Sequence, residues 1–344
     1  MKEAQKYAPV HLWVTAISLM MLSVVFTALF IPDGKMLSSA RNRYFLGEGA
    51  RNVLFSFHPW GAGIAAAGVI ALIVFLILEK GSGQAFRFAG VCPFFALFCS
   101  RLLYGLAELP FYLNYAGFTA LFRADEGGMS LAGAMAGAFL AYRLTFGKDR
   151  GAQGSLALSL AVLVPLVKGV CFFSPGGLGL GRETESGLPG LFSMQGEWGC
   201  LLRVYAIEFL LGLLILALLL ILKRYDGRKM LFSRYLVMFG VMEVLMLSLR
   251  NDHHMEWGFV KAGMIFSFLP AAFVTVFSGT GKKMRLFSAG VTMLFAIFVF
   301  LLEKARDRAW IPEEGILYAL YLLLCVGYIV YSIWVSGRGL RLRK

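Results

Sequence analysis

Long apolar segments recur along the whole chain, and they constrain its fold more than any other feature. A helix needs about 20 mostly apolar residues to cross the hydrocarbon core of a bilayer, and we count about ten such segments. They cover residues 11–30, 60–78, 89–112, 129–146, 156–173, 204–222, 231–249, 258–277, 286–302 and 316–335. Because lipid offers the backbone no hydrogen-bond partners, each segment is expected to be a helix. The sequence therefore predicts an all-α polytopic integral membrane protein of about ten transmembrane helices.

The composition supports a membrane protein and indicates its orientation. Charged residues are 15% of the chain, apolar residues are 59% and the mean hydropathy is +0.73, whereas soluble domains carry about 25% charged residues. Most of the basic residues behind the net charge of +13 fall on one side of a ten-span arrangement. The positive-inside rule then predicts that both termini are cytoplasmic. No basic soluble domain is present to bind nucleic acid, so anionic headgroups are the favoured partners of these charges.

Metal and disulfide chemistry are not indicated. The five cysteines form no C-x-x-C pair and have no metal-ligand spacing. His253 and His254 are adjacent, between Asp252 and Glu256, but no H-E-x-x-H motif or second ligand cluster accompanies them. A solvated interfacial loop is the favoured interpretation of this segment, and we expect neither a metal nor another cofactor.

Charged side chains inside the apolar segments are candidates for function. Such groups are costly in a membrane unless they are paired or line a wet cavity. They lie in or at the edges of the predicted spans: Arg101, Glu108, Arg143, Lys168, Glu208, Glu243, Arg250 and Lys261. Two interpretations remain open. The charges can form buried ion pairs that fix helix packing, or they can line a polar site in the interior of the bundle.

One short sequence combines several structural signals. In E-G-G-M-S-L-A-G-A-M-A-G, Gly127 and Gly128 permit positive φ and a close backbone approach. Ser130 is placed to cap the start of a helix. Gly133 and Gly137 form a small-xxx-small face suited to tight helix contact.

These residues resemble the phosphatidylglycerol–prolipoprotein diacylglyceryl transferases, membrane enzymes that lipidate bacterial prolipoproteins. That family has G-A-R-L-x-Y before one loop and G-G-M-S-F-H-G-G after it, and the present chain has C-S-R-L-L-Y and G-G-M-S-L-A-G-A. The matching residues are Arg101, Leu102, Tyr104, Gly127, Gly128, Met129, Ser130 and Gly133. The histidine of the family is Ala132 here.

Further family motifs are matched in part. The aligned positions that keep the family's residue are Gly61, Gly169, Gly177, Gly181, Arg182, Glu208, Gly240 and Arg250. Other positions are exchanged: the family's tyrosine becomes Trp60, and two of its arginines become Val170 and Glu243. Lys168, beside Val170, can supply a charge but not the bidentate fork of arginine.

The resemblance implies a reaction and assigns roles. A prolipoprotein cysteine thiolate would attack the glycerol carbon of phosphatidylglycerol, form a thioether and release glycerol phosphate. Phosphate contact would fall to Arg101, Lys168, Arg182 and Arg250, and Tyr104, Gly127, Gly128 and Ser130 would complete the substrate site. Glu208, Glu243 and His254 are candidate proton acceptors, and we assign catalysis to Glu243, Arg250 and Glu208. The implied partners are an anionic phospholipid and the signal-peptide region of a prolipoprotein, in the bacterial inner membrane.

The resemblance also suggests a division of the chain. Residues 60–278 would form a seven-span core, residues 1–59 an additional N-terminal span with an outside loop, and residues 279–344 two additional spans with a basic tail. Two other functions remain open. A catalytically inactive relative that binds phospholipid or lipoprotein is favoured by the exchanged residues, and a small-solute transporter is disfavoured because no internal repeat is present.

Overall fold

Ten α-helices within the described residues correspond to the ten predicted spans. The computed structural model describes residues 10–30, 59–109, 112–116, 128–173, 180–184, 190–195, 200–250, 256–257, 260–308, 310 and 314–341. The helices are α1 (Val10–Phe30), α3 (Pro59–Leu78), α4 (Gly83–Ala107), α6 (Leu131–Phe146), α7 (Arg150–Val170), α8 (Val204–Asp226), α9 (Leu231–Leu249), α10 (Ala262–Ser278), α11 (Gly281–Asp307) and α12 (Glu314–Arg341). Eight candidate spans are long and apolar enough to cross a membrane, and α6 and α10 are shorter apolar helices. The chain is thus an all-α, multi-pass membrane protein, as predicted.

The chain divides into two compact units, which comprise residues 1–232 and 233–344. The boundaries predicted after residues 59 and 278 rest on the family resemblance and stay predictions.

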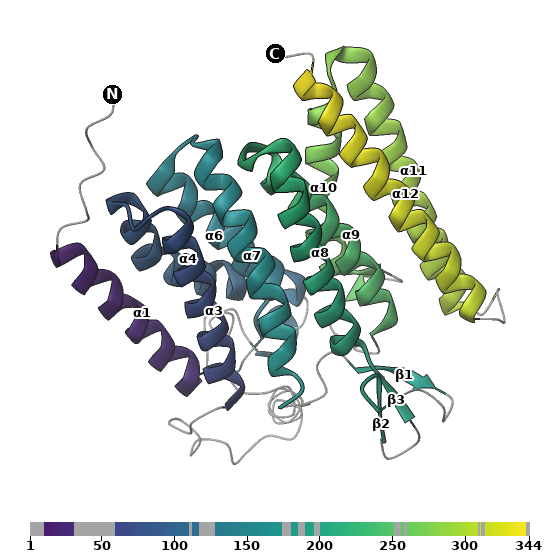
Figure 1. Cartoon of the computed structure of the whole chain (residues 1–344). Helices are drawn as coiled ribbons and strands as arrows, with labels where there is room; N and C mark the ends of the chain where they lie inside the picture. The colour runs from purple at the N-terminus through teal and green to yellow at the C-terminus, as the bar shows by residue number, and fades with distance from the viewer. Residues whose placement is uncertain are drawn as a thin grey trace. The chain divides into compact units, whose positions relative to one another are not determined.

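Helices of the first unit pack both against neighbours in sequence and against helices further along the chain. α4 packs on α6, α7 packs on α3 and α8, and α1 packs on α3 and α4 (Figure 1). Several helices begin at a side-chain cap: Ser82 accepts a hydrogen bond from Ala85 N, and Asp149 accepts one from Gly151 N. Such caps satisfy amides that lack a partner at the start of a helix.

The contact between α4 and α6 is close because α6 presents glycines to it. A Cβ atom on Gly133 would lie 2.5 Å from the carbonyl oxygen of Cys99. A Cβ atom on Gly137 would overlap the carbonyl oxygen of Phe95 and lie 2.8 Å from the Cα of Ala96. The predicted small-residue face is therefore confirmed, and it brings the two helix backbones together.

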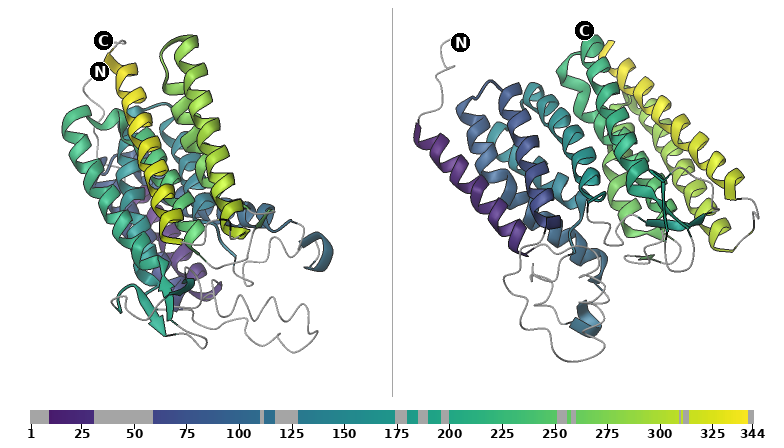
Figure 2. Two further views of the ribbon diagram at one scale, coloured as in Figure 1. Left: turned by 90° about the vertical axis from the view of Figure 1, so that its right-hand side faces the viewer. Right: turned by 60° about the horizontal axis from the view of Figure 1, so that its bottom comes forward.

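A small antiparallel sheet precedes α8. It has the order β1-β3-β2, with β1 (Leu180–Thr184), β2 (Ser193–Gln195) and β3 (Cys200–Arg203), and lies at the N-terminal end of α8 (Figure 2). The glycine-rich local sequence around β1 favours neither a helix nor a strand, yet residues 180–184 form a strand. Pairing with β3 satisfies the backbone of β1, a tertiary effect that local composition does not reveal.

The second unit contains the end of the chain. β4 (Glu256–Trp257) pairs with β5 (Val260–Lys261) before α10, and α11 and α12 form an antiparallel hairpin that packs on α10 (Figures 1 and 2). Hydrogen bonds between side-chain hydroxyls join α12 to α11 and α10: Ser288 to Tyr331 at 3.0 Å, Thr292 to Tyr328 at 3.0 Å, and Thr275 to Ser332 at 2.9 Å. Buried hydroxyls that are hydrogen-bonded in this way fix one packing of the hairpin.

Candidate functional site

Arg101 lies near the C-terminal end of α4, and its side chain is held on several sides. The residue is only 6% exposed. Its guanidinium carbon lies 5.8 Å from the ring centre of Tyr104 and 5.5 Å from that of Tyr112, which is in the π-helical turn η1 (Tyr112–Ala116). Arg101 Nη1 donates a hydrogen bond to the carbonyl oxygen of Gly128 at 3.2 Å. Aromatic faces and a carbonyl oxygen are favourable neighbours for a buried guanidinium.

The segment before α6 is attached to α4 beside Arg101. Ser130 N donates to the carbonyl oxygen of Ser100 at 3.2 Å, and Ser100 Oγ donates to the carbonyl oxygen of Ser130 at 2.8 Å. The side chain of Ser130 accepts from Gly133 N at 3.3 Å and caps α6, as predicted. Gly128 has φ +74°, and a Cβ atom there would overlap the Tyr104 ring, so this position requires glycine. Four predicted site residues, Arg101, Tyr104, Gly128 and Ser130, therefore lie at one junction of α4 and α6.

Lys168 and Glu208 form a second polar group in the same unit. Lys168 Nζ lies 2.7 Å from Glu208 Oε2, with exposed side-chain fractions of 10% and 0%. Lys168 is in the last turn of α7, and Glu208 is in the second turn of α8. Lys168 was predicted to contact phosphate and Glu208 to accept a proton. In the structure their side chains form an ion pair with each other.

An apolar cluster borders both polar groups. Its buried members are Trp60 at the start of α3, Cys171, Tyr205 and Ala206. Partly buried side chains packed against them are Ile64, Leu97, Met129, Val170, Phe172 and Phe192. Met129 lies between the Gly128 and Ser130 of the Arg101 junction, and Tyr205 is in the first turn of the helix that carries Glu208. The cluster thus joins the Arg101 junction to the end of the bundle where Lys168 pairs with Glu208.

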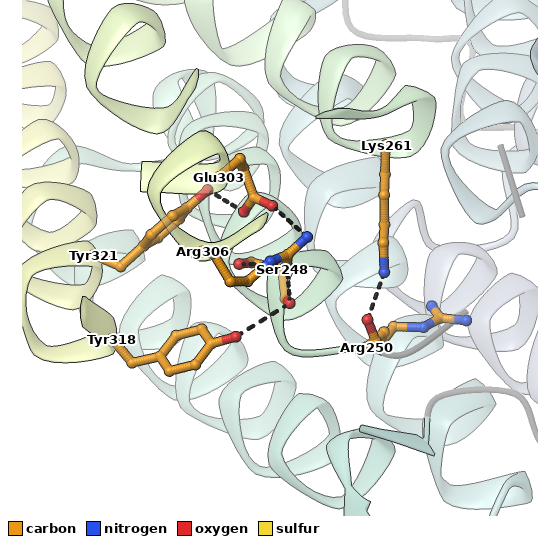
Figure 3. A network of polar contacts seen from close by, with 7 residues as sticks. All are labelled: Ser248, Arg250, Lys261, Glu303, Arg306, Tyr318 and Tyr321. Atoms are coloured by element: carbon orange, nitrogen blue, oxygen red, sulfur yellow. Dashed lines mark hydrogen bonds and ion pairs between the residues drawn. The ribbon is translucent and has the colours of Figure 1, made fainter. Parts of the chain in front are cut away.

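Glu243 and Arg250 belong to the second unit. Glu243 is 6% exposed on α9, and Arg250 directly follows that helix. The carbonyl oxygen of Arg250 accepts a hydrogen bond from Lys261 Nζ at 2.6 Å (Figure 3). Their predicted catalytic roles stay predictions.

Arg182 is the remaining predicted site residue that the structure describes. It lies in β1, in the strand that pairs with β3. Gly127, His253 and His254 lie outside the described residues.

Sequence reasoning missed several residues that complete these arrangements. Ser100 precedes Arg101 in C-S-R-L-L-Y, and its polarity within an apolar segment was the available signal. Tyr112 supplies the second aromatic face on Arg101, but it lies beyond the matched motif. Glu303 and Arg306 form a buried ion pair at 2.8 Å, and both were missed because the predicted span ended at residue 302.

Comparisons with family models, with curated proteins and with solved structures each returned no match. The class defined by fold and composition is therefore a multi-pass α-helical membrane protein, and the particular activity is a matter for proposal.

Proposed function

We propose that the protein transfers a diacylglyceryl group from phosphatidylglycerol to the cysteine thiol of a prolipoprotein in the bacterial inner membrane. The observation that carries this proposal is the junction of Arg101 with Tyr104, Gly128 and Ser130. These residues come from two separate motifs of the family resemblance, and in the folded chain they contact one another or lie side by side.

Arg101 has the chemistry that the leaving group requires. In the transfer, the thiolate sulfur bonds to the glycerol carbon while the bond between that carbon and the phosphate oxygen breaks. Glycerol phosphate leaves with the electron pair. A guanidinium presents its donors in a planar fork that matches phosphate oxygens, and a buried cation stabilises the developing charge more strongly than an exposed one does.

The cysteine proton needs an acceptor, and Glu243 is the proposed one. It stands on α9 where the family has arginine, and Arg250 directly follows the end of the same helix. In this proposal Arg250 is a phosphate-binding residue. Glu208 holds Lys168 rather than acting as the base, because the two side chains form an ion pair.

The proposed orientation places both termini in the cytoplasm. Its support is the distribution of Lys and Arg among the loops. The ten helices described here alternate in direction if each crosses the bilayer once. The first unit then has the ends of α4 and α7 and the starts of α6 and α8, and with them the Arg101 junction, on the outer side.

A second function is a relative that binds phospholipid or lipoprotein without transfer. Two observations favour it: Ala132 replaces the family histidine, and the charges of Lys168 and Glu208 are directed at each other. Both binding and transfer require Arg101 to contact the lipid phosphate, and only transfer forms a covalent product.

Phospholipid binding by purified variants tests the shared part of both functions. Arg101→Lys should weaken binding of phosphatidylglycerol because one donor group replaces the fork, and Arg101→Met should remove the charge. Hydrogen bonds to charged groups contribute about 1.5–3 kcal/mol, so Arg101→Met should raise Kd about tenfold to a hundredfold. Arg143→Met is the matched control, because Arg143 is an exposed arginine of the same unit whose Nη1 donates to the nearby carbonyl oxygen of Gly147. A folded Arg101→Met variant that binds like wild type would exclude the proposed role.

A further inference from the structure

The C-terminal end of α9 is capped by cations from elsewhere in the second unit. Carbonyl oxygens in the last turn of a helix lack intrahelical partners. The carbonyl oxygen of Ser248 accepts from Arg306 Nη1 at 2.5 Å and from the Tyr318 hydroxyl at 3.4 Å. Two residues later, the carbonyl oxygen of Arg250 accepts from Lys261 Nζ at 2.6 Å (Figure 3). Positive charge at this end also interacts favourably with the helix dipole.

Arg306 is itself fixed by the hairpin of α11 and α12. Its Nη2 lies 2.8 Å from Glu303 Oε2, and Glu303 is fully buried. The other carboxylate oxygen of Glu303 accepts from the Tyr321 hydroxyl of α12 at 3.0 Å. The guanidinium thus bridges a carboxylate on its own helix and the end of α9, and Nη1 also reaches Ser248 Oγ at 3.2 Å (Figure 3).

The capped last turn of α9 leads directly into Arg250. Arg250 is the first residue after α9, and its amide still donates to the carbonyl oxygen of Met246 at 3.2 Å. The direction in which its side chain leaves the helix therefore depends on whether the last turn stays wound. Lys261 is 3% exposed and Arg306 reaches the turn from another helix, so burial and charge both hold this turn in place.

We propose that Arg306 and Lys261 are positioning residues, which hold the last turn of α9 so that Arg250 is presented in one fixed orientation. This inference rests on the proposed phosphate-binding role of Arg250. It makes the α11–α12 hairpin, an addition outside the family resemblance, part of the functional apparatus. Glu303 acts one step further away, by orienting the guanidinium of Arg306.

The test combines hydrogen exchange with phospholipid binding on the full-length protein. Arg306→Met alone would leave the carboxylate of Glu303 buried without its ion-pair partner, so the principal variant is Glu303→Gln with Arg306→Met. Amide exchange in residues 245–250 should become about tenfold faster or more, because a hydrogen bond to a charged donor contributes at least that factor. The affinity for phosphatidylglycerol should fall in the same variant, while exchange in α10 stays unchanged.

Two further variants separate positioning from packing. Arg306→Lys keeps the charge and a donor, so it should restore much of both the protection of the last turn and the affinity. Lys304→Met is the matched control, since Lys304 lies on the same helix and contacts the Trp310 ring at 5.4 Å; it should change neither quantity.

Unchanged exchange at residues 245–250 in the folded double variant would overturn the cap, and faster exchange with wild-type lipid affinity would overturn the positioning role. Wild-type protein that binds no phospholipid would instead refute the proposed function, and the positioning role with it, whereas faster exchange would still establish the cap.

Discussion

The ion pair between Lys168 and Glu208 makes the sharpest prediction about the first unit. Replacing Lys168 by Met removes the cation in contact with the carboxylate of Glu208, which is fully buried. Replacing Glu208 by Gln removes the carboxylate in contact with a nearly buried ammonium. The double variant Lys168→Met with Glu208→Gln removes both charges of this pair.

The expected magnitudes follow from burial and distance. At 2.7 Å the two charged atoms are in direct contact. Removing one partner of a buried pair destabilises a protein by about 3–5 kcal/mol, whereas replacing both by neutral groups is often close to neutral. We therefore expect each single variant to lose about 3 kcal/mol or more and the double variant to lose less than either. The interaction free energy should then be about 3 kcal/mol or more, at the upper end of the range seen for residues in contact.

The measurement is a double-mutant cycle of unfolding free energy, made in one detergent or bicelle at constant pH and salt. Charge-conserving Lys168→Arg serves as a control and should lose less than Lys168→Met. Additive losses in the two single variants would refute the reasoning, because additivity would mean that the charges do not interact. Lower phospholipid affinity in a double variant of normal stability would assign the pair to the substrate site as well as to packing.

Two other predictions concern helix contact and topology. Gly137→Leu should separate α6 from α4, which should lower the melting temperature and, by displacing the Arg101 junction, weaken lipid binding. Ala136→Leu, on the exposed side of α6, should have little effect on the melting temperature or on lipid binding. Equal melting temperatures for the two variants would contradict the close helix contact. In a cysteine-free background, Gly190→Cys should react with an impermeant thiol reagent in intact cells and Lys229→Cys only after lysis; the reverse pattern would overturn the proposed orientation.

The sequence predicted the helices well because bilayer thickness and hydropathy set their lengths. Spans 60–78 and 231–249 were predicted within one residue of α3 and α9. α4 begins before the predicted start at residue 89, because Ser82 caps it and the polar first turns were excluded by hydropathy. Residues Ser130, Gly133 and Gly137 were also interpreted correctly, since capping and close helix contact depend on local residue type.

The pairing of side chains could be predicted only in part. Lys168 and Glu208 were both singled out as charges inside apolar segments, but their contact depends on how α7 packs on α8, which spacing along the chain does not specify. The same holds for Arg306, whose partners are Ser248 on α9 and Glu303 on its own helix. A span limited to apolar residues ends before these charges, and so it omits the residues that fix the hairpin.

The central claim is the transfer reaction, and a product assay tests it most directly. Purified protein is incubated with phosphatidylglycerol and a lipobox peptide, and the peptide is examined by mass spectrometry. We predict a peptide whose cysteine carries a diacylglyceryl thioether, with release of glycerol phosphate. This product should be lost in Arg101→Met and Glu243→Gln but not in Arg143→Met. No thioether product from wild type, together with saturable phosphatidylglycerol binding, would contradict the transferase and leave the lipid-binding relative as the function of this chain.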